Sequence, residues 1–308
     1  MAIVNTGVPI TSALSEKYLE EIVKAYPGCT LETLTETVFG RKVQALTVGE
    51  GPRKVLVTAA HHANEWITAL VLLKFAEEIA AAIAAGGNIF GVEAKTIARQ
   101  VSVHIVPMVN PDGVDLVVGA ATEAEVKLAR RLSENYPEIP FPDGWKADLL
   151  GTDLNLQYPA GWLRAREIKF LQGFTRPGPR DFVGIAPLFQ REAKALAAYT
   201  EQVDPQVVLA YHTQGKEIYW QFEDIEIPGA RELGEEFARL SGYELTQVAY
   251  NSSFAGYKDW FIKFFRRPGY TIEAGAGENP LPLEQFDEIY KDNLGILVTA
   301  ATGLPGGA

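Results

Sequence analysis

The sequence predicts an α/β fold in a single domain over residues 1–308. The expected core is a central, twisted, mixed and mostly parallel sheet of about eight strands, flanked by helices on both faces. Short apolar or alternating segments, several rich in β-branched residues, alternate along the chain with longer segments of helical periodicity. Such an alternation is typical of parallel or mixed sheets whose two faces are covered. No internal repeat or low-complexity linker divides the chain.

Each expected element follows from its local pattern. The run Val55-Leu56-Val57 and the segment "VSVHIVP" are short and apolar, as buried strands are, and "PGYTIE" is rich in β-forming residues. Strands are expected near residues 33–38, 42–48, 54–60, 101–107, 206–211, 216–222, 245–250 and 269–273. Helices are expected near residues 12–26, 66–86, 122–134, 189–203, 229–241, 254–265 and 282–300.

Composition and charge limit the possible partners. Hydrophobic residues make up 47% and charged residues 22% of the chain, as in an ordinary soluble globular protein. The net charge of −11 argues against nucleic acid and anionic lipid as partners, and an acidic substrate would need lysine or arginine inside the cleft. No run approaches the ~18 apolar residues of a membrane span. The N-terminal segment lacks a signal-peptide pattern, so we expect a cytoplasmic protein. The oligomeric state does not follow from the composition.

A metal site in this chain has to be built from histidine and carboxylate. Cys29 is the one cysteine, which excludes a disulfide framework and a thiolate cluster, and we expect it to be a buried thiol. The stretch "AAHHANEWIT" follows the strand near 54–60 and contains His62 and Glu65. Residues three apart in a tight or helical turn project the same way, so these two side chains can meet one ion.

The third candidate ligand is His212, which ends the apolar segment "VVLAYH". His62 and Asn110 also follow expected strands, and in such sheets the ligand cleft lies beyond the carboxyl ends of the strands. Three protein ligands with a fourth position left to water are typical of catalytic zinc. His104 is expected in the core, and His61 is expected to point away from His62 and to play no part in the site.

Five separated motifs resemble, in order and in context, those of the zinc carboxypeptidase (carboxypeptidase A-like) family. They are "HHANEWIT", "NPDG", "GTDLN", "AYH" and "TIEAG", and the resemblance spans about residues 55–275. It implies that His62, Glu65 and His212 bind one Zn²⁺ per chain. It also implies that Asp153 orients the first histidine, because a metal-bound histidine generally needs a carboxylate or carbonyl partner.

The resemblance assigns the chemistry to two further residues. Glu273 corresponds to the general base, which takes a proton from water acidified by zinc and delivers it to the leaving amine. Lys146, in "GWKAD", falls near the family's oxyanion-stabilising arginine, so a cation is retained there in altered form.

The chain departs from the family pattern where the substrate carboxylate is held. The motif "DLN" is followed by Leu156 instead of an arginine, and an aliphatic chain cannot replace a bidentate guanidinium. Ile262 stands where a tyrosine is expected after Asp-Trp, and Asn64 stands where the type member carries another arginine. These changes disfavour recognition of an ordinary peptide C-terminus.

The motifs "HHANEWIT", "GTDLNLQYPAGW", "GFTRPGPRDFVG" and "AGYKDW" resemble those of a bacterial subgroup, the γ-D-glutamyl-L-diamino acid endopeptidases, over nearly the whole chain. The subgroup cuts peptidoglycan-derived peptides between γ-D-glutamate and diaminopimelate. Unlike some members, this chain is expected to be a catalytic domain without a LysM wall-binding module. The candidate substrate-binding residues are Asn64, Asn155, Arg176 and Arg180, with Arg266 and Arg267 as further candidate cations.

Two alternatives remain open at this point. The chain can be an ordinary metallocarboxypeptidase that releases C-terminal residues, which Leu156 and Ile262 disfavour. It can also be a binding module that holds cell-wall peptides without zinc or catalysis, which the presence of three ligands and Glu273 disfavours.

Overall fold

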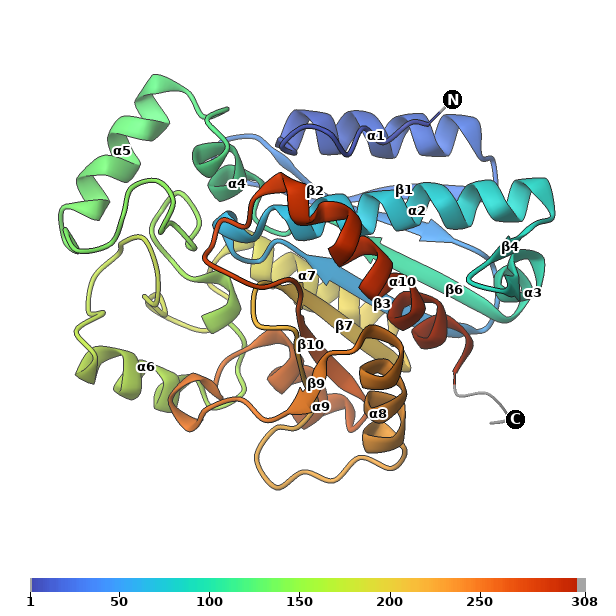
Figure 1. The fold of residues 1–308 in the computed structure, drawn as a ribbon. Coiled ribbons are helices and arrows are strands. Elements are labelled where there is room, and N and C mark those ends of the chain that lie inside the picture. Colours follow the sequence, from blue (N-terminus) through green and yellow to red (C-terminus); the bar gives the residue numbers. More distant parts are fainter. Residues whose placement is uncertain (1, 304–308) are drawn as a thin grey trace.

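The computed structural model, which describes residues 2–303, is built around one eight-stranded sheet (Figure 1). In spatial order the strands are β1 (Cys29–Glu36), β2 (Lys42–Val48), β6 (Val101–Val106), β3 (Arg53–Ala59), β7 (Val207–His212), β10 (Gly269–Glu273), β8 (Glu217–Tyr219) and β9 (Glu244–Thr246). The strands β6, β3, β7 and β10 run parallel at the centre, β8 and β9 also pair parallel, and the other three pairings are antiparallel. The predicted mixed, mostly parallel sheet is therefore confirmed.

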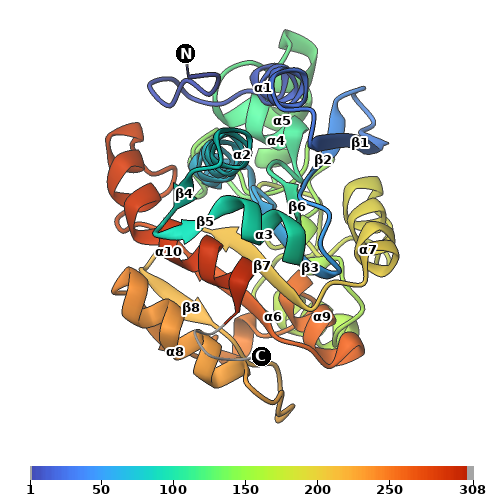
Figure 2. The ribbon, with the colours of Figure 1, turned by 90° about the vertical axis from the view of Figure 1, so that its right-hand side faces the viewer.

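Helices cover both faces of the sheet. They are α1 (Ser12–Ala25), α2 (Ile67–Ala85), α3 (Ala94–Gln100), α4 (Pro111–Val117), α5 (Glu123–Ser133), α6 (Trp162–Leu171), α7 (Arg191–Val203), α8 (Ala230–Ser241), α9 (Tyr257–Phe265) and α10 (Phe286–Thr302). Figure 2 shows α2 and α10 on one side of the sheet, with α7 and α9 on the other. Side chains alternate along each strand, so Val55 and Val57 pack into one core while Leu56 packs into the other.

The apolar sequence of helix α2 matches its buried position in the fold. Residues on all sides of α2 are apolar, and most of this helix is buried between the sheet and the outer helices α1 and α10. It ends at Gly86, whose φ of 64° is the left-handed conformation that glycine adopts without strain. Its first residue, Ile67, directly follows the turn that contains His62 and Glu65, so this rigid helix supports that turn.

Several elements differ from the sequence-based expectation. The first strand begins at Cys29, four residues before the expected start, and β8 and β9 are only three residues long. The short helices α3, α4 and α6 and the hairpin of β4 (Asn88–Ile89) and β5 (Val92–Glu93) were not predicted. Helices of seven residues span too few turns for a periodic pattern, and α6 has apolar residues on its exposed side, such as Leu163 and Leu171.

Polar residues gather at the carboxyl edge of the parallel strands. His62 follows β3, Asn110 follows β6, His212 ends β7, and Glu273 ends β10. Cys29 is buried, as expected, and burial raises the pKa of its thiol to about 11. Among residues 2–303, no helix combines the length and the apolar character that crossing a bilayer requires.

Candidate metal centre and active-site cleft

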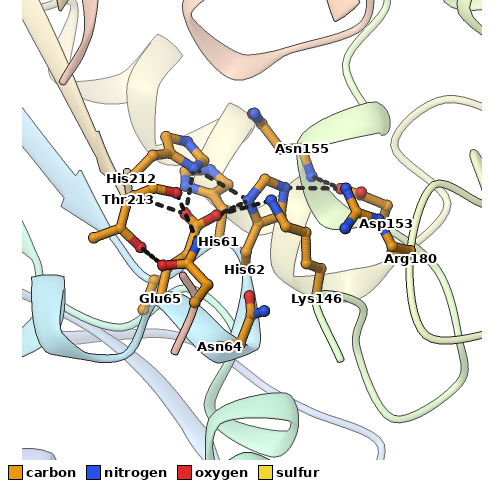
Figure 3. Close-up of polar contacts among 12 residues, drawn as sticks. His61, His62, Asn64, Glu65, Lys146, Asp153, Asn155, Arg180, His212 and Thr213 are labelled. Carbon is orange, nitrogen blue, oxygen red and sulfur yellow. Dashed lines mark hydrogen bonds and ion pairs between the residues drawn. The ribbon is translucent and has the colours of Figure 1, made fainter. Parts of the chain in front are cut away.

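Three side chains converge at the carboxyl edge of the sheet. Nδ1 of His62 lies 2.8 Å from Oε1 of Glu65, and Nδ1 of His212 lies 2.8 Å from Oε2 of the same carboxylate (Figure 3). One ligand atom from each residue lies within 4.8 Å of the others, close enough to hold one ion. Two imidazole nitrogens and one carboxylate form a donor set that suits zinc and leaves a position open.

The turn that carries two of these ligands is held by backbone hydrogen bonds from a distant loop. A 3₁₀ turn, η1 (Ala63–Glu65), follows β3, and its Ala63 and Asn64 amides donate to the carbonyls of Lys146 and Trp145 at 3.0 and 3.1 Å. The Thr68 hydroxyl donates to the Glu65 carbonyl at 2.6 Å and joins the turn to the start of α2. The ligands therefore stand on a fixed turn rather than on a free loop.

Asp153 orients the first histidine. Nε2 of His62 donates to Oδ1 of Asp153 at 3.2 Å, which leaves Nδ1 directed at Glu65 and His212. Burial alone would raise the pKa of the Asp153 carboxyl, but the His62 imidazole and Lys146 hold it below its usual range. The carboxylate therefore remains ionised and keeps accepting from the ring.

The neighbours of Glu65 favour its ionised form. It is only 1% exposed, and burial opposes its charge, but His62, Lys146 and His212 hold its pKa well below the usual range. Nζ of Lys146 donates to Oε1 at 3.1 Å. Burial lowers the pKa of Lys146, but the Glu65 carboxylate raises it, and the net pKa lies above its usual value. The lysine therefore carries its charge inside the site.

Glu273 stands beside the cluster because of strand register. In the parallel pairing of β10 with β7, Glu273 is the partner of His212. Burial, reinforced by the charge of Glu65, raises the pKa of the Glu273 carboxyl. A half-buried carboxyl with a raised pKa next to a cluster of metal ligands has the properties of a proton acceptor and donor.

One cleft of about 1030 Å³ contains almost all of the predicted site residues. Its lining includes His62, Asn64, Glu65, Lys146, Asp153, Asn155, Leu156, Arg180, His212 and Glu273. Arg180 is partly exposed and forms an ion pair of 2.6 Å with Asp181. Leu156, 8% exposed, lies in the lining where the resemblance leads one to expect a guanidinium.

The structure does not bring the other predicted arginines to the cleft. Arg176 is exposed and does not line the cleft. The Tyr136 hydroxyl holds its loop by donating to the Arg176 carbonyl and accepting from the Arg176 amide. Arg266 and Arg267 precede β10 and so lie at the opposite edge of the sheet, where Arg267 pairs with Asp204 at 2.6 Å. These three assignments are corrected: loop path and strand direction carry the side chains elsewhere.

Ile262 lies in the core and not in the cleft lining. This side chain is 1% exposed and packs in the core between α9 and the sheet, so it does not face a substrate. This position therefore supplies no polar group to the cleft, as expected from the absence of the tyrosine.

Two asparagines predicted to bind substrate already have partners. Nδ2 of Asn64 donates to the Asp143 carbonyl at 2.9 Å, while its buried Oδ1 has no hydrogen-bond partner among the described residues. Oδ1 of Asn155 accepts from the Tyr257 amide at 3.0 Å and so holds the first turn of α9. Asn64 therefore has a free acceptor beside the cleft, whereas Asn155 joins two walls of it.

Among the described residues, His61 belongs neither to the metal-ligand group nor to the cleft lining, as expected, but it packs against one of the ligands. Its fully buried ring stacks on His212 with centroids 5.6 Å apart, and its Nε2 lies 3.2 Å from the Tyr158 hydroxyl. Burial lowers the pKa of His61 well below its usual range, so the ring is neutral. It packs behind the second metal ligand. His104 lies in β6, as predicted, where it is half-buried rather than in the core, with Nδ1 2.8 Å from the Tyr199 hydroxyl.

Sequence reasoning missed charged residues on the far walls of the cleft. Lys169 and Asp181 form an ion pair of 2.5 Å, and Lys258 and Asp259 form another of 2.6 Å; all four line the cleft. The adjacent opposite charges in "YKDW" were the available signal for the second pair. A helical charge pair is ordinarily solvated, so the pattern alone does not place it in a cleft.

Comparison with known proteins agrees with this geometry. The family model described as zinc carboxypeptidase matches residues 15–295. The chain is 40% identical to γ-D-glutamyl-L-diamino acid endopeptidase 1 of Lysinibacillus sphaericus, with 91% of this chain and 69% of that protein covered. It is 38% identical to the uncharacterized protein YqgT of Bacillus subtilis, with 92% and 74% covered. Its fold is similar to that of the carboxypeptidase A of Helicoverpa armigera, with a TM-score of 0.71 at 16% identity over 97% of this chain and 75% of that one.

Proposed function

The chain belongs to the zinc carboxypeptidase family of metallopeptidases, and from that premise we propose that it hydrolyses the amide bond between γ-D-glutamate and diaminopimelate in peptidoglycan-derived peptides. The 40% identity to a relative named for this bond, extending over 91% of the chain, supports the proposal. The observation that carries it is Leu156 in the cleft lining, because an aliphatic side chain cannot clamp an ordinary C-terminal carboxylate.

His62, Glu65 and His212 would hold the zinc, since their ligand atoms already lie within 4.8 Å of one another. When bound, zinc polarises the scissile carbonyl and lowers the pKa of water. Glu273, across from His212 in the sheet register, takes the proton from the attacking water and delivers it to the nitrogen of the leaving diaminopimelate. Its raised pKa suits both halves of that transfer.

Lys146 is placed to stabilise the negative charge that develops on the carbonyl oxygen. Its ammonium reaches Glu65 at 3.1 Å, so it lies at the metal cluster, and it remains charged. A fixed and mostly buried cation stabilises such an anion more than mobile solvent does. Because the lysine ammonium is a point charge, it stabilises the oxyanion without the bidentate hydrogen bonds that an arginine would form.

The chemistry of the proposed substrate fits the charges of the cleft. A γ-linked glutamate keeps a free α-carboxylate near the scissile bond, and the acidic chain has to bind it with local cations. Arg180 and Lys169 share one carboxylate, Asp181, so within this ion-paired group the cations outnumber the carboxylate. We assign Arg180, the partly exposed member, to that carboxylate.

The test is mass spectrometry of defined peptides. The zinc-loaded protein is incubated with L-Ala-γ-D-Glu-diaminopimelate, with the tetrapeptide that has a further D-Ala, and with dipeptides that end in Phe or Arg. Release of L-Ala-D-Glu from the first two, with little cleavage of the dipeptides, is expected. Protein carrying Glu273→Gln controls for a contaminating peptidase. A higher kcat/KM on the dipeptides would instead establish an ordinary carboxypeptidase.

A further inference from the structure

A buried ion pair of two sequence neighbours lines the cleft away from the metal cluster. Lys258 and Asp259 stand in the first turn of α9, and each is 4% exposed. Nζ of Lys258 lies 2.6 Å from Oδ1 of Asp259 and donates to the Gln221 carbonyl at 2.5 Å. Burying two charges costs several kcal/mol per ion before their attraction is counted, so a pair inside a cleft needs an explanation.

The pair is not fully satisfied within the described part of the chain. Oδ1 of Asp259 receives no directed hydrogen bond, although the lysine nitrogen is near, because the contact is an ion pair in poor hydrogen-bonding orientation. Its other oxygen accepts from the Gly256 amide at 3.3 Å. Asp259 lines the cleft, and a buried carboxylate oxygen with an unused acceptor direction can accept from a ligand donor that enters beside it.

The charge balance of this wall differs from that of the Arg180 wall. There, two cations share Asp181, which suits an anion. Here, one ammonium and one carboxylate stand side by side, which suits a ligand group that carries both charges. A zwitterion can exchange partners with such a pair, so the net buried charge does not change on binding.

The position of the pair is tied to the reacting centre. Asp153, which orients His62, is two residues before Asn155, and Asn155 holds the amide of Tyr257, the residue that precedes Lys258. On the other side, α9 packs against β10, whose Thr271 lines the cleft two residues before Glu273. The pair and the reacting centre therefore line one cleft, joined through Asn155 on one side and through β10 on the other.

We propose that Lys258 and Asp259 bind the free amino-acid end of the diaminopimelate side chain, with Lys258 donating to its carboxylate and Asp259 accepting from its ammonium. This inference rests on the proposed function and names the groups that select the leaving residue. It predicts selection for diaminopimelate over lysine, since lysine has the ammonium and lacks the carboxylate.

The first experiment uses the unchanged zinc-loaded enzyme. It compares kcat/KM on L-Ala-γ-D-Glu-diaminopimelate with kcat/KM on the same peptide bearing L-lysine, and with the form whose side-chain carboxylate is a carboxamide. A preference of ~10-fold or more for the free carboxylate over both is expected, as for a site that loses a charged hydrogen-bond partner. Equal values on the three peptides would overturn the inference. Cleavage of none of them would instead remove the proposed function beneath it.

The second experiment tests whether Lys258 causes the preference for the side-chain carboxylate. Lys258→Gln should lower kcat/KM on the diaminopimelate peptide by ~10- to ~100-fold, mainly through KM, and leave the lysine peptide within about threefold. Lys258→Arg, which keeps the cation, should keep the preference. Lys263→Gln is the matched control, because Lys263 is on the same helix, lies outside the cleft and pairs with Glu223. A Lys258→Gln enzyme that is folded and retains the wild-type ratio between the two peptides would contradict the assignment.

Discussion

Nε2 of His62 donates to Oδ1 of Asp153 at 3.2 Å across 91 residues of sequence. The bond joins the turn after β3 to the loop before η2 (Leu154–Leu156), and it determines which nitrogen of the imidazole faces the metal cluster. Asp153 also accepts from the Asn155 amide at 3.0 Å and from the Asp181 amide at 3.3 Å. One carboxylate thus orients a metal ligand and anchors two walls of the cleft.

Asp153→Asn is expected to weaken zinc binding by about 10- to 100-fold, the usual effect of changing the partner of a ligating histidine. The Asn155 and Asp181 amides donate to different oxygens of Asp153, so asparagine, with one acceptor oxygen, can keep only one of these two bonds. Zinc affinity is measured by competition with a chromogenic chelator, with thermal unfolding of the metal-free proteins as the check on folding. Wild-type affinity in the variant would show that Asp153 does not orient the ring.

His212→Ala is expected to remove both bound zinc and activity while leaving the protein folded. The histidine ends a central strand, but the sheet has its own apolar core on both faces and does not depend on the ion. Elemental analysis of the dialysed protein gives the zinc content, and circular dichroism reports the fold. Full zinc occupancy in this variant would exclude the proposed ligand set.

Glu273→Gln is expected to keep zinc and lose ~10²-fold or more in kcat, the scale associated with a general acid or base. Glutamine preserves the shape of the side chain and cannot accept the proton. Steady-state rates on the diaminopimelate tripeptide are compared at equal zinc content. Near-normal turnover would move the role to another residue of the cleft.

Lys146→Met is expected to lower kcat by about 10²-fold with little change in KM, because charge on the carbonyl oxygen develops only in the transition state. Methionine has a similar length and no charge. The loss of the ion pair with Glu65 leaves that ligand with its two histidines, so the zinc content is measured in parallel. A change confined to KM would reassign Lys146 to binding of the ground-state substrate.

Glu192 predicts a pH dependence of stability that is independent of the active site. It stands in the first turn of α7, 4% exposed, and burial raises the pKa of its carboxyl from 4.5 to about 7. Below pH 4.5 the carboxyl is protonated in both the folded and the unfolded chain. Between pH 4.5 and about 7 only the unfolded chain releases the proton, so the free energy of unfolding falls across this window.

Glu192→Gln removes that titration. The difference in free energy of unfolding between this variant and wild type should therefore be about 2–3 kcal/mol more favourable to the variant at pH 8 than at pH 4.5. Urea unfolding of the metal-free proteins at the two pH values measures the difference. Glu201→Gln, at the exposed far end of the same helix, is the control. A parallel response of the two variants would show that Glu192 ionises normally in the folded chain.

The order of elements and the metal ligands were readable from the sequence because they depend on local pattern. Apolar segments alternate with helical ones, which predicts the sheet, and polar residues at strand ends then fall on one edge. That rule brings His62 and His212 together without knowledge of any loop. The family motifs added Glu273 at the end of another strand, and Asp153 and Lys146 in loops where periodicity predicts nothing.

The walls of the cleft were decided by tertiary structure. The sequence offers arginines at 176, 180, 266 and 267, and only Arg180 reaches the cleft, because the path of its loop and its pairing with Asp181 carry it there. Lys258 and Asp259 resemble any surface charge pair until α9 is packed against β10. Which side chains line a cleft built from loops depends on contacts between residues far apart in the chain, and these contacts leave no periodic signal in the sequence.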